Sequence, residues 1–264
     1  MKKILVVLLV VLVSCIGSQA FAASYADIAF VIDQSGSMSG EFSWLSTSIT
    51  GIDSAITSDA NITDVNYGVA GYEYYAGNDP TPHPYGYTTP NAWQDITSDI
   101  NAITTELGTV SVYGGTERGY QAADWAADNF SWTGGDYAKV MVLITDEPND
   151  YRASYSYNGL TGEAALAAKM ADESILLNVI TFQSYFQYWD DIAFSNPSSG
   201  FLGLFDLDYL RTDAAGFTAD FTAAKLAEIV VVDPGNQPVP EPSTILLLGG
   251  GLLGLVFARR KMNK

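Results

Sequence analysis

The sequence has little cysteine, histidine or basic charge, and each shortage excludes a class of protein. Cys15 is the only cysteine in 264 residues, so the chain cannot form an internal disulfide and must rely on its core or on a metal for stability. His83 is the only histidine, which leaves zinc without its usual nitrogen and sulfur ligands. No H-E-x-x-H or G-x-S-x-G motif is present, so the sequence offers little support for a hydrolase.

Basic side chains are scarce in the body of the chain. The formal net charge is -18, and residues 23–238 contain 29 acidic and 6 basic side chains. This balance argues against binding nucleic acid or an anionic membrane surface, because either would require a basic patch. It suits calcium, magnesium or a cationic surface. The length accommodates one domain of about 200 residues together with targeting segments.

The N-terminus has the features of a secretory signal peptide over residues 1–22. Two lysines precede an apolar run from Ile4 to Val13, and Ala20-Phe21-Ala22 is a small-x-small cleavage site, so we expect cleavage after Ala22. An alternative is a lipoprotein box at 12–15, which would make Cys15 the lipid-bearing N-terminus.

The C-terminus consists of a Pro-rich linker at 233–238 and a three-part segment at 239–264. A V-P-E-P sequence precedes an apolar stretch at 245–258 and a basic cluster at 259–261. The apolar stretch is shorter than the roughly 20 residues that span a bilayer comfortably. This order resembles the PEP-CTERM sorting signal, which an exosortase protease recognises and cleaves at the membrane. The residues of the motif are Pro240, Glu241 and Pro242. An ordinary tail anchor is the alternative.

The region between these segments alternates apolar strands with amphipathic helices. Strands are expected at 26–33, 65–74, 137–145 and 176–182, and helices at 41–56, 92–107, 117–130, 162–172 and 214–229. This alternation predicts an α/β domain over residues 23–232, with a doubly wound, mostly parallel central sheet and helices on both faces.

Two buried strands end on an aspartate. Asp33 follows AFVI and Asp146 follows MVLIT, so both carboxylates lie at one edge of the sheet if the strands are parallel neighbours. The spacing Asp33-x-Ser35-x-Ser37 lets an extended turn aim three oxygen side chains at one point, which suits a hard cation.

The segments VIDQSGSM (31–38), GGT (114–116) and ITD (144–146) resemble the metal-ion-dependent adhesion site of the von Willebrand factor type A domain, which has a Rossmann-like fold. The resemblance implies direct ligation of Mg²⁺, Mn²⁺ or Ca²⁺ by Ser35, Ser37 and Thr116. It implies that Asp33 and Asp146 bind directly or through water. Because hydroxyls supply much of this shell, the cation can accept a carboxylate from another molecule. We expect Gly36 to permit the tight turn, and Gly114 and Gly115 to permit the approach of Thr116.

Each segment also has a simpler interpretation. Ser35 and Ser37 could cap a helix, Thr116 could be an N-cap, and Asp146 could close a turn before Pro148. The occurrence of all three segments in order at the ends of predicted elements favours the metal site.

Two features depart from the family pattern or add to it. Glu147 and Asp150 follow Asp146, where many family members have glycine, and add charge near the metal unless they only form a solvated loop. Tyrosines cluster in two loops and form either a contact surface or core filling. They are Tyr72, Tyr74, Tyr75, Tyr85, Tyr87, Tyr151, Tyr155 and Tyr157.

The expected function is metal-dependent binding or adhesion, without catalysis. The partner would be a protein or an acidic ligand that presents a carboxylate, and the exosortase would be a second partner. Only the terminal segments would contact a membrane, and the final location would be the cell surface, the outer envelope or the extracellular matrix. The alternatives are a structural matrix protein whose metal stabilises the fold and a metal-dependent hydrolase.

Overall fold

The computed structural model describes residues 24–72, 93–112, 115, 117–135, 137–150, 152–196 and 201–232, which belong to one compact unit, Ser24–Pro234. The expected signal peptide, linker and sorting segment lie outside these residues. The same holds for His83, Gly114, Thr116, Tyr74, Tyr75, Tyr85, Tyr87 and Tyr151. Within the part that is described, no helix has the length and apolarity needed to cross a membrane.

A six-stranded sheet forms the centre of the unit. From edge to edge its strands are β10 (Leu204–Asp206), β7 (Ile175–Thr181), β4 (Tyr137–Ile144), β1 (Ser24–Asp33), β2 (Ile62–Tyr72) and β3 (Trp93–Thr97). Neighbouring strands are parallel except for β3, which pairs antiparallel with β2. The predicted doubly wound, mostly parallel sheet is therefore confirmed.

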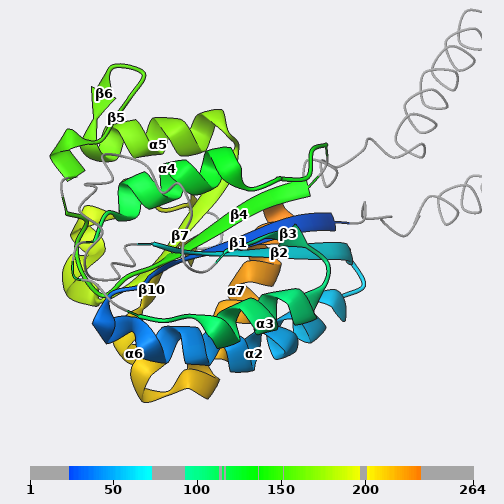
Figure 1. The fold of residues 1–264 in the computed structure, drawn as a ribbon. Helices are drawn as coiled ribbons and strands as arrows, with labels where there is room; N and C mark the ends of the chain where they lie inside the picture. Colours follow the sequence, from blue (N-terminus) through cyan, green and yellow to red (C-terminus); the bar gives the residue numbers. More distant parts are fainter. Residues whose placement is uncertain are drawn as a thin grey trace, which may run out of the picture. The chain divides into compact units, whose positions relative to one another are not determined.

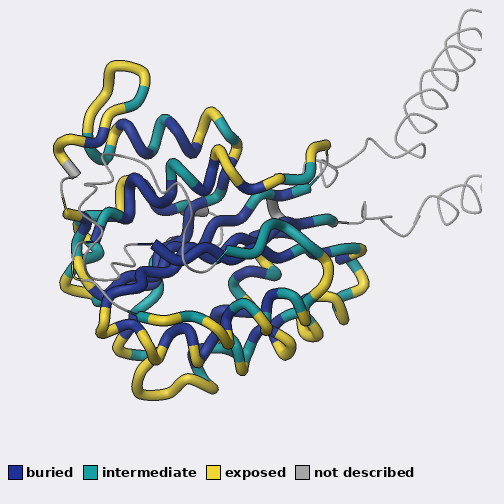
Figure 2. Tube along the Cα trace, in the orientation of Figure 1, coloured by how far each residue is buried: buried dark blue, intermediate teal, exposed yellow. Residues whose placement is uncertain are grey.

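Helices cover both faces of the sheet (Figures 1 and 2). One layer contains α2 (Ser39–Thr57), α3 (Ile100–Thr109) and α7 (Ala214–Val232), and the other contains α4 (Gly119–Asn129) and α5 (Gly162–Asp172). Successive residues of a strand point to opposite faces, so β1 contributes Ile28, Phe30 and Ile32 to the first layer and Ala29 and Val31 to the second. Burial on both faces explains why β1 and β4 are almost continuously apolar.

The helix expected at 92–107 is wrong in its first half. Residues 93–97 form the edge strand β3, because Trp93 stacks on Phe130 with ring centroids 4.7 Å apart and meets the edge of Trp125. Asp99 then caps α3 by accepting a hydrogen bond from the backbone N–H of Asn101 at 3.0 Å. Tertiary packing overrides the helical spacing of this segment.

Sequence reasoning missed several short elements. These are β5 (Ser156–Tyr157), β6 (Leu160–Thr161), β8 (Ser195–Asn196), β9 (Phe201–Leu202), β10, α6 (Leu207–Thr212) and the 3₁₀ turns η1 (Gly36–Met38), η2 (Arg152–Ser154) and η3 (Gln183–Tyr188). Two to six residues carry too little periodicity to be recognised. Tyr72 and Tyr155 are buried in the core of the α4 and α5 layer, so these two tyrosines fill the core.

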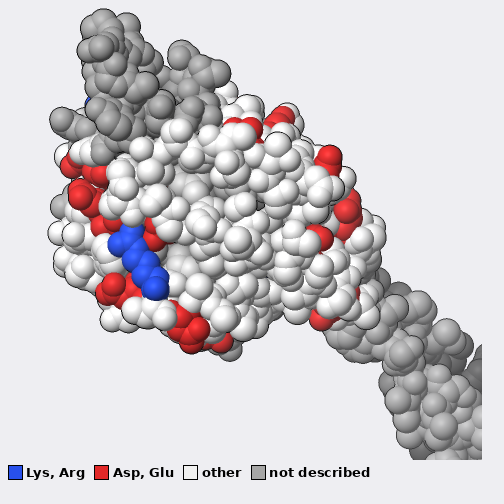
Figure 3. Space-filling view, turned by 60° about the horizontal axis from the view of Figure 1, so that its bottom comes forward, with Lys and Arg blue, Asp and Glu red and all other residues white. Residues whose placement is uncertain are grey.

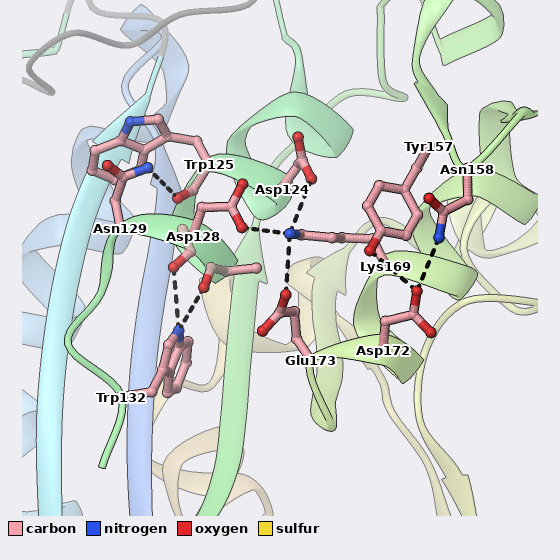
Figure 4. A network of polar contacts seen from close by, with 12 residues as sticks. Asp124, Trp125, Asp128, Asn129, Trp132, Tyr157, Asn158, Lys169, Asp172 and Glu173 are labelled. Carbon is pink, nitrogen blue, oxygen red and sulfur yellow. Dashed lines mark hydrogen bonds and ion pairs between the residues drawn. The ribbon is translucent and has the colours of Figure 1, made fainter. Parts of the chain in front are cut away.

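An ion cluster joins α4 to α5 (Figure 4). The ammonium group of Lys169 contacts Asp128 and lies 3.9 Å from Asp124 and 3.3 Å from Glu173. The lysine side chain is 5% exposed, whereas the three carboxylates are one-third exposed or more. Lys169 thus partly neutralises the three carboxylates that lie between the two helices.

Candidate functional site

The carboxyl ends of β1 and β4 bring the first group of candidate residues together. These strands are parallel neighbours with Ile32 opposite Ile144, so Asp33 and the segment that contains Asp146 leave the same edge of the sheet. Asp33 is fully buried, and Asp146 is 7% exposed. Thr145 connects the two strand ends, because its hydroxyl lies 3.4 Å from Oδ2 of Asp33.

The turn after β1 gathers the oxygen atoms of the D-x-S-x-S motif. The backbone N–H of Ser35 donates to Oδ1 of Asp33 at 2.7 Å, which fixes the carboxylate. The hydroxyl oxygens of Ser35 and Ser37 lie 3.2 Å apart. Ser35 is buried and Ser37 is exposed. The motif therefore extends from the core to the surface and places two hydroxyls side by side.

The simpler capping interpretation does not account for Ser35. It precedes η1, but its side chain makes no capping hydrogen bond within the described structure, and Met38 is the N-cap residue of α2. The expectation for Gly36 is also wrong. Its φ lies outside the positive region, and a Cβ added there would meet nothing within 4 Å. The turn does not require glycine.

Arg211 of α6 lies against the proposed site. One Nη atom donates to Oδ2 of Asp146 at 3.0 Å, and Nε donates to Oε1 of Glu41 at 2.6 Å. The guanidinium also lies over the ring of Phe182, 5.2 Å from its centroid. Arg211 therefore joins a carboxylate of α2 to the loop after β4. Asp146 has an electrostatic partner and does more than close a turn.

Negative charge near the site exceeds what Arg211 neutralises. Oδ1 of Asp146 and Oε2 of Glu41 are buried and have no hydrogen-bond partner among the described residues. Oε2 of Glu117 is in the same condition. Burial raises the pKa of Glu117 to about 8, with further contributions from the charges of Asp33, Glu147 and Asp150. Acidic side chains are therefore crowded together here, and Glu117 holds its proton at neutral pH. A cation bound in this region would reduce the repulsion between the acids and favour the ionised form of Glu117.

The two acids expected to add charge near the metal lie at the protein surface. Glu147 and Asp150 are exposed, and the backbone N–H of Asp150 donates to the carbonyl oxygen of Glu117 at 2.5 Å. Between them, Asn149 is buried and accepts a hydrogen bond from the backbone N–H of Tyr120 at 2.7 Å. The loop after β4 is therefore tied to the N-terminus of α4, the helix that follows the expected ligand Thr116.

The described residues contain no group of three or more His, Cys, Asp or Glu side chains arranged to hold a metal ion. A cation at this edge would consequently depend on the serine hydroxyls as well as on carboxylates. Thr116 and the sorting residues Pro240, Glu241 and Pro242 lie outside the described residues.

Sequence reasoning missed Glu41, Glu117 and Arg211. Arg211 had one available signal, because it is one of only six basic residues between positions 23 and 238. Figure 3 shows a small patch of basic atoms with acidic side chains beside it, and further acidic side chains along the edges of the same face. A groove of about 720 Å³ opens beside Ser37, Glu41 and Arg211 and continues between α2 and α7, past Trp44 and Thr218.

Comparisons with protein-family models identify two regions of the chain. The model of the von Willebrand factor type A domain matches residues 27–188, and the model of the PEP-CTERM protein-sorting motif matches residues 238–261. No curated protein matches the chain.

Solved structures share the fold at low sequence identity. Pilus adhesin SpaC from Lactobacillus rhamnosus GG, in its open conformation, is 15% identical with a TM-score of 0.54, over 81% of this chain and 31% of that one. Proximal thread matrix protein 1 from the mussel byssus, with a zinc-occupied MIDAS motif, is 17% identical with a TM-score of 0.51, over 77% of this chain and 46% of that one. The chain spans less than half the length of either protein.

Proposed function

Because this chain belongs to the von Willebrand factor type A family, we propose that it is an exported binding module that recognises its partner through a divalent cation. The proposed ligands are Asp33, Ser35, Ser37, Thr116 and Asp146. Glu147 and Asp150 are accessory acids at the rim. Mg²⁺, Mn²⁺ and Ca²⁺ are the candidate metals, since the ligands are all oxygen atoms.

The observation that carries this proposal is the excess of buried carboxylate oxygen at the edge where the D-x-S-x-S turn lies. Oδ1 of Asp146 and Oε2 of Glu117 are buried without a described hydrogen-bond partner, and the serine hydroxyls lie 3.2 Å apart beside Asp33. Such atoms are costly to bury without a partner. The residues fit a hard cation.

A divalent cation at this edge would supply an open coordination position for a carboxylate from another molecule. The chain's own residues prepare that position. Thr145 and the N–H of Ser35 hold the carboxylate of Asp33, and Arg211 holds that of Asp146. Ser37, which is exposed, lies where the motif meets solvent and the adjoining groove. The groove offers the partner a further contact surface.

The sorting motif supports an exported destination. Under this proposal residues 1–22 are removed as a signal peptide, residues 23–232 form the binding domain, and 233–238 link it to the sorting segment 239–264. An exosortase-type protease would process that segment at the membrane, and the domain would act at the cell surface, in the outer envelope or in the extracellular matrix. The occurrence of the fold in a pilus adhesin and a byssal matrix protein is compatible with such a role.

Calorimetric titration of the purified protein with Mg²⁺, Mn²⁺ and Ca²⁺ tests the metal site. We expect Asp33→Asn to abolish binding. Asp27→Asn is the matched control, because Asp27 is also fully buried on β1 but accepts hydrogen bonds from Asn66 and Thr133 instead. Binding that survives Asp33→Asn, or that both variants lose equally, would exclude the assignment.

A second measurement separates recognition from a purely structural metal. A pull-down from the surface of the producing cell, with and without chelator, is compared for the wild type and Asp33→Asn. Capture that requires both the metal and Asp33 supports recognition. Retained capture together with a lower melting temperature would favour a matrix protein in which the cation only stabilises the fold.

A further inference from the structure

A polar triad lies in the core between β7 and α7. Asn178 comes from β7, and Lys225 and Glu228 come from successive turns of α7. Asn178 and Lys225 are fully buried, and Glu228 is 3% exposed. The rings of Phe205 and Phe221 flank the lysine, with their centroids 5.3 and 5.6 Å from Nζ. Lysines are almost never fully buried unless they are paired, and Lys225 has Glu228 as its ionic partner.

Glu228 contacts both other members of the triad. Nδ2 of Asn178 donates to Oε1 of Glu228 at 2.9 Å and to Oε2 at 3.2 Å. Nζ of Lys225 contacts the same Oε2. Two hydrogen bonds to one oxygen keep the amine and amide nitrogens within about 6 Å of each other.

The carboxamide of Asn178 is only partly satisfied. Its Oδ1 atom is buried and accepts no hydrogen bond from any residue that the structure describes. An ion pair alone would not require the asparagine, and a buried ion pair is weak evidence of stabilisation. The arrangement instead contains an amine, a carboxamide and a carboxylate between them, which are the groups needed to form an amide.

We propose that Lys225 and Asn178 become joined by an intramolecular isopeptide bond, with Glu228 as the proton-transfer group. Glu228 takes one proton from the ammonium of Lys225. The lone pair of Nζ then forms a bond to Cγ of Asn178, and the bond from Cγ to Nδ2 breaks. A second proton passes from Nζ to the leaving nitrogen, which departs as ammonia. Charge and atoms balance, and no oxidant or cofactor is required.

The surroundings favour each part of this step. Burial lowers the pKa of Lys225, which favours the neutral, nucleophilic amine over the ammonium. The aromatic rings exclude water, so hydrolysis does not compete with attack by the amine.

The bond would link the last helix of the domain to the interior of the sheet. β7 lies between β4 and β10, and α7 is the last described element before the C-terminal segment. A mechanical force applied to that segment would then be transmitted to the sheet through a covalent bond as well as through the packing of α7. Since the only cysteine is Cys15, this link would replace a disulfide. The proposal is independent of metal binding.

Peptide mapping of the purified full-length protein tests the bond. Trypsin should release residues 170–211, which contain Asn178, and residues 212–225, which end at Lys225. With the bond, cleavage after Lys225 fails. The peptide that begins at Thr212 then continues past Lys225 to Arg259 and remains attached to 170–211. The joined species is about 17 Da lighter than 170–211 and 212–259 combined, because ammonia is lost. Cleavage after Lys169 is the internal control.

Denaturation before digestion gives trypsin access to every lysine and arginine, whether or not a variant folds compactly. Recovery of separate 170–211 and 212–225 peptides from the wild type would overturn the proposal. Lys225→Met and Asn178→Ala should each abolish the joined species. Glu228→Gln should reduce it at least tenfold, and an undiminished yield in that variant would overturn the role of Glu228.

Discussion

Replacement of Arg211 by methionine removes the cation that joins Glu41 to Asp146. The two hydrogen bonds measure 2.6 and 3.0 Å, and the carboxylates of Glu41 and Asp146 are 2% and 7% exposed. Both carboxylates would lose their ion pair with Arg211 while remaining largely shielded from solvent. We expect the metal-free protein to lose stability and to bind a divalent cation more tightly.

The two effects differ in size. Breaking a buried ion pair costs about 3–5 kcal/mol. Because the side chain of Arg211 is 33% exposed, solvent screening reduces the expected loss to about 2 kcal/mol. For metal binding, a guanidinium and a divalent cation about 4 Å apart repel by about 8 kcal/mol at the effective dielectric of a protein surface, which is twice the value for two unit charges. Arg211 can turn toward solvent, so we expect a smaller gain of about 1.4 kcal/mol, or tenfold in affinity.

Urea denaturation measures the change in stability, first without divalent ions and then with saturating Mg²⁺ or Ca²⁺. Calorimetric titration measures the change in metal affinity. The loss of stability in Arg211→Met should shrink when metal is present, because the cation then compensates Asp146. Lys139→Met is the control, since Lys139 donates to the carbonyl oxygen of Glu173. Unchanged metal-free stability together with unchanged or weaker metal affinity would refute the reasoning.

Three further predictions concern other parts of the domain. Burial raises the pKa of Asp27 above 3.8, so the folded state holds this proton more tightly than the unfolded state does, and stability should fall as pH rises from 3.8 through the higher pKa. Urea denaturation at several pH values should show a smaller decline in Asp27→Asn. An unchanged dependence of stability on pH in that variant would contradict this prediction. Lys169→Met should cost about 1 kcal/mol at low salt and less in 1 M salt, where the repulsion among the exposed acids is screened; a loss independent of salt would point to packing instead. In Gly71→Ala the new Cβ would come within 2.3 Å of the side chain of Gln34, the residue next to Asp33, so we expect the free energy of unfolding to fall by about 1–3 kcal/mol and metal binding to weaken. Gly36→Ala is the control and should change neither quantity, because a Cβ there meets nothing within 4 Å. Equal behaviour of the two variants in denaturation and titration would refute this contrast.

The main elements of the fold could be predicted because their signals are local. β1 and β4 are apolar runs whose residues are buried on both faces, and α2 repeats apolar residues at helical spacing. β3 could not be predicted, because its conformation depends on pairing with β2 and on contact between Trp93 and Phe130. α6 was missed because six residues carry little periodicity.

The candidate site divides in the same way. Asp33, Ser35 and Ser37 are adjacent in sequence, and Asp146 ends a recognisable strand, so their convergence could be expected from a parallel sheet. Their ligand roles remain predictions. The contact of Arg211 with Asp146 spans 65 positions, and its contact with Glu41 spans 170. No local pattern encodes such distant pairs.

Local sequence patterns suffice to predict the alternation of strands and helices, the aspartates that end β1 and β4, and the resemblances at the adhesion motif and the C-terminus. Each is carried by a run of neighbouring residues whose spacing matches a helix, a strand or a motif. Which charged side chains from distant segments come into contact depends on tertiary packing. It brings Arg211 to Asp146 at the sheet edge and buries Lys225 and Glu228 of α7 against Asn178 of β7. Those contacts arise when separate elements pack, because packing removes the water that would otherwise satisfy each group on its own.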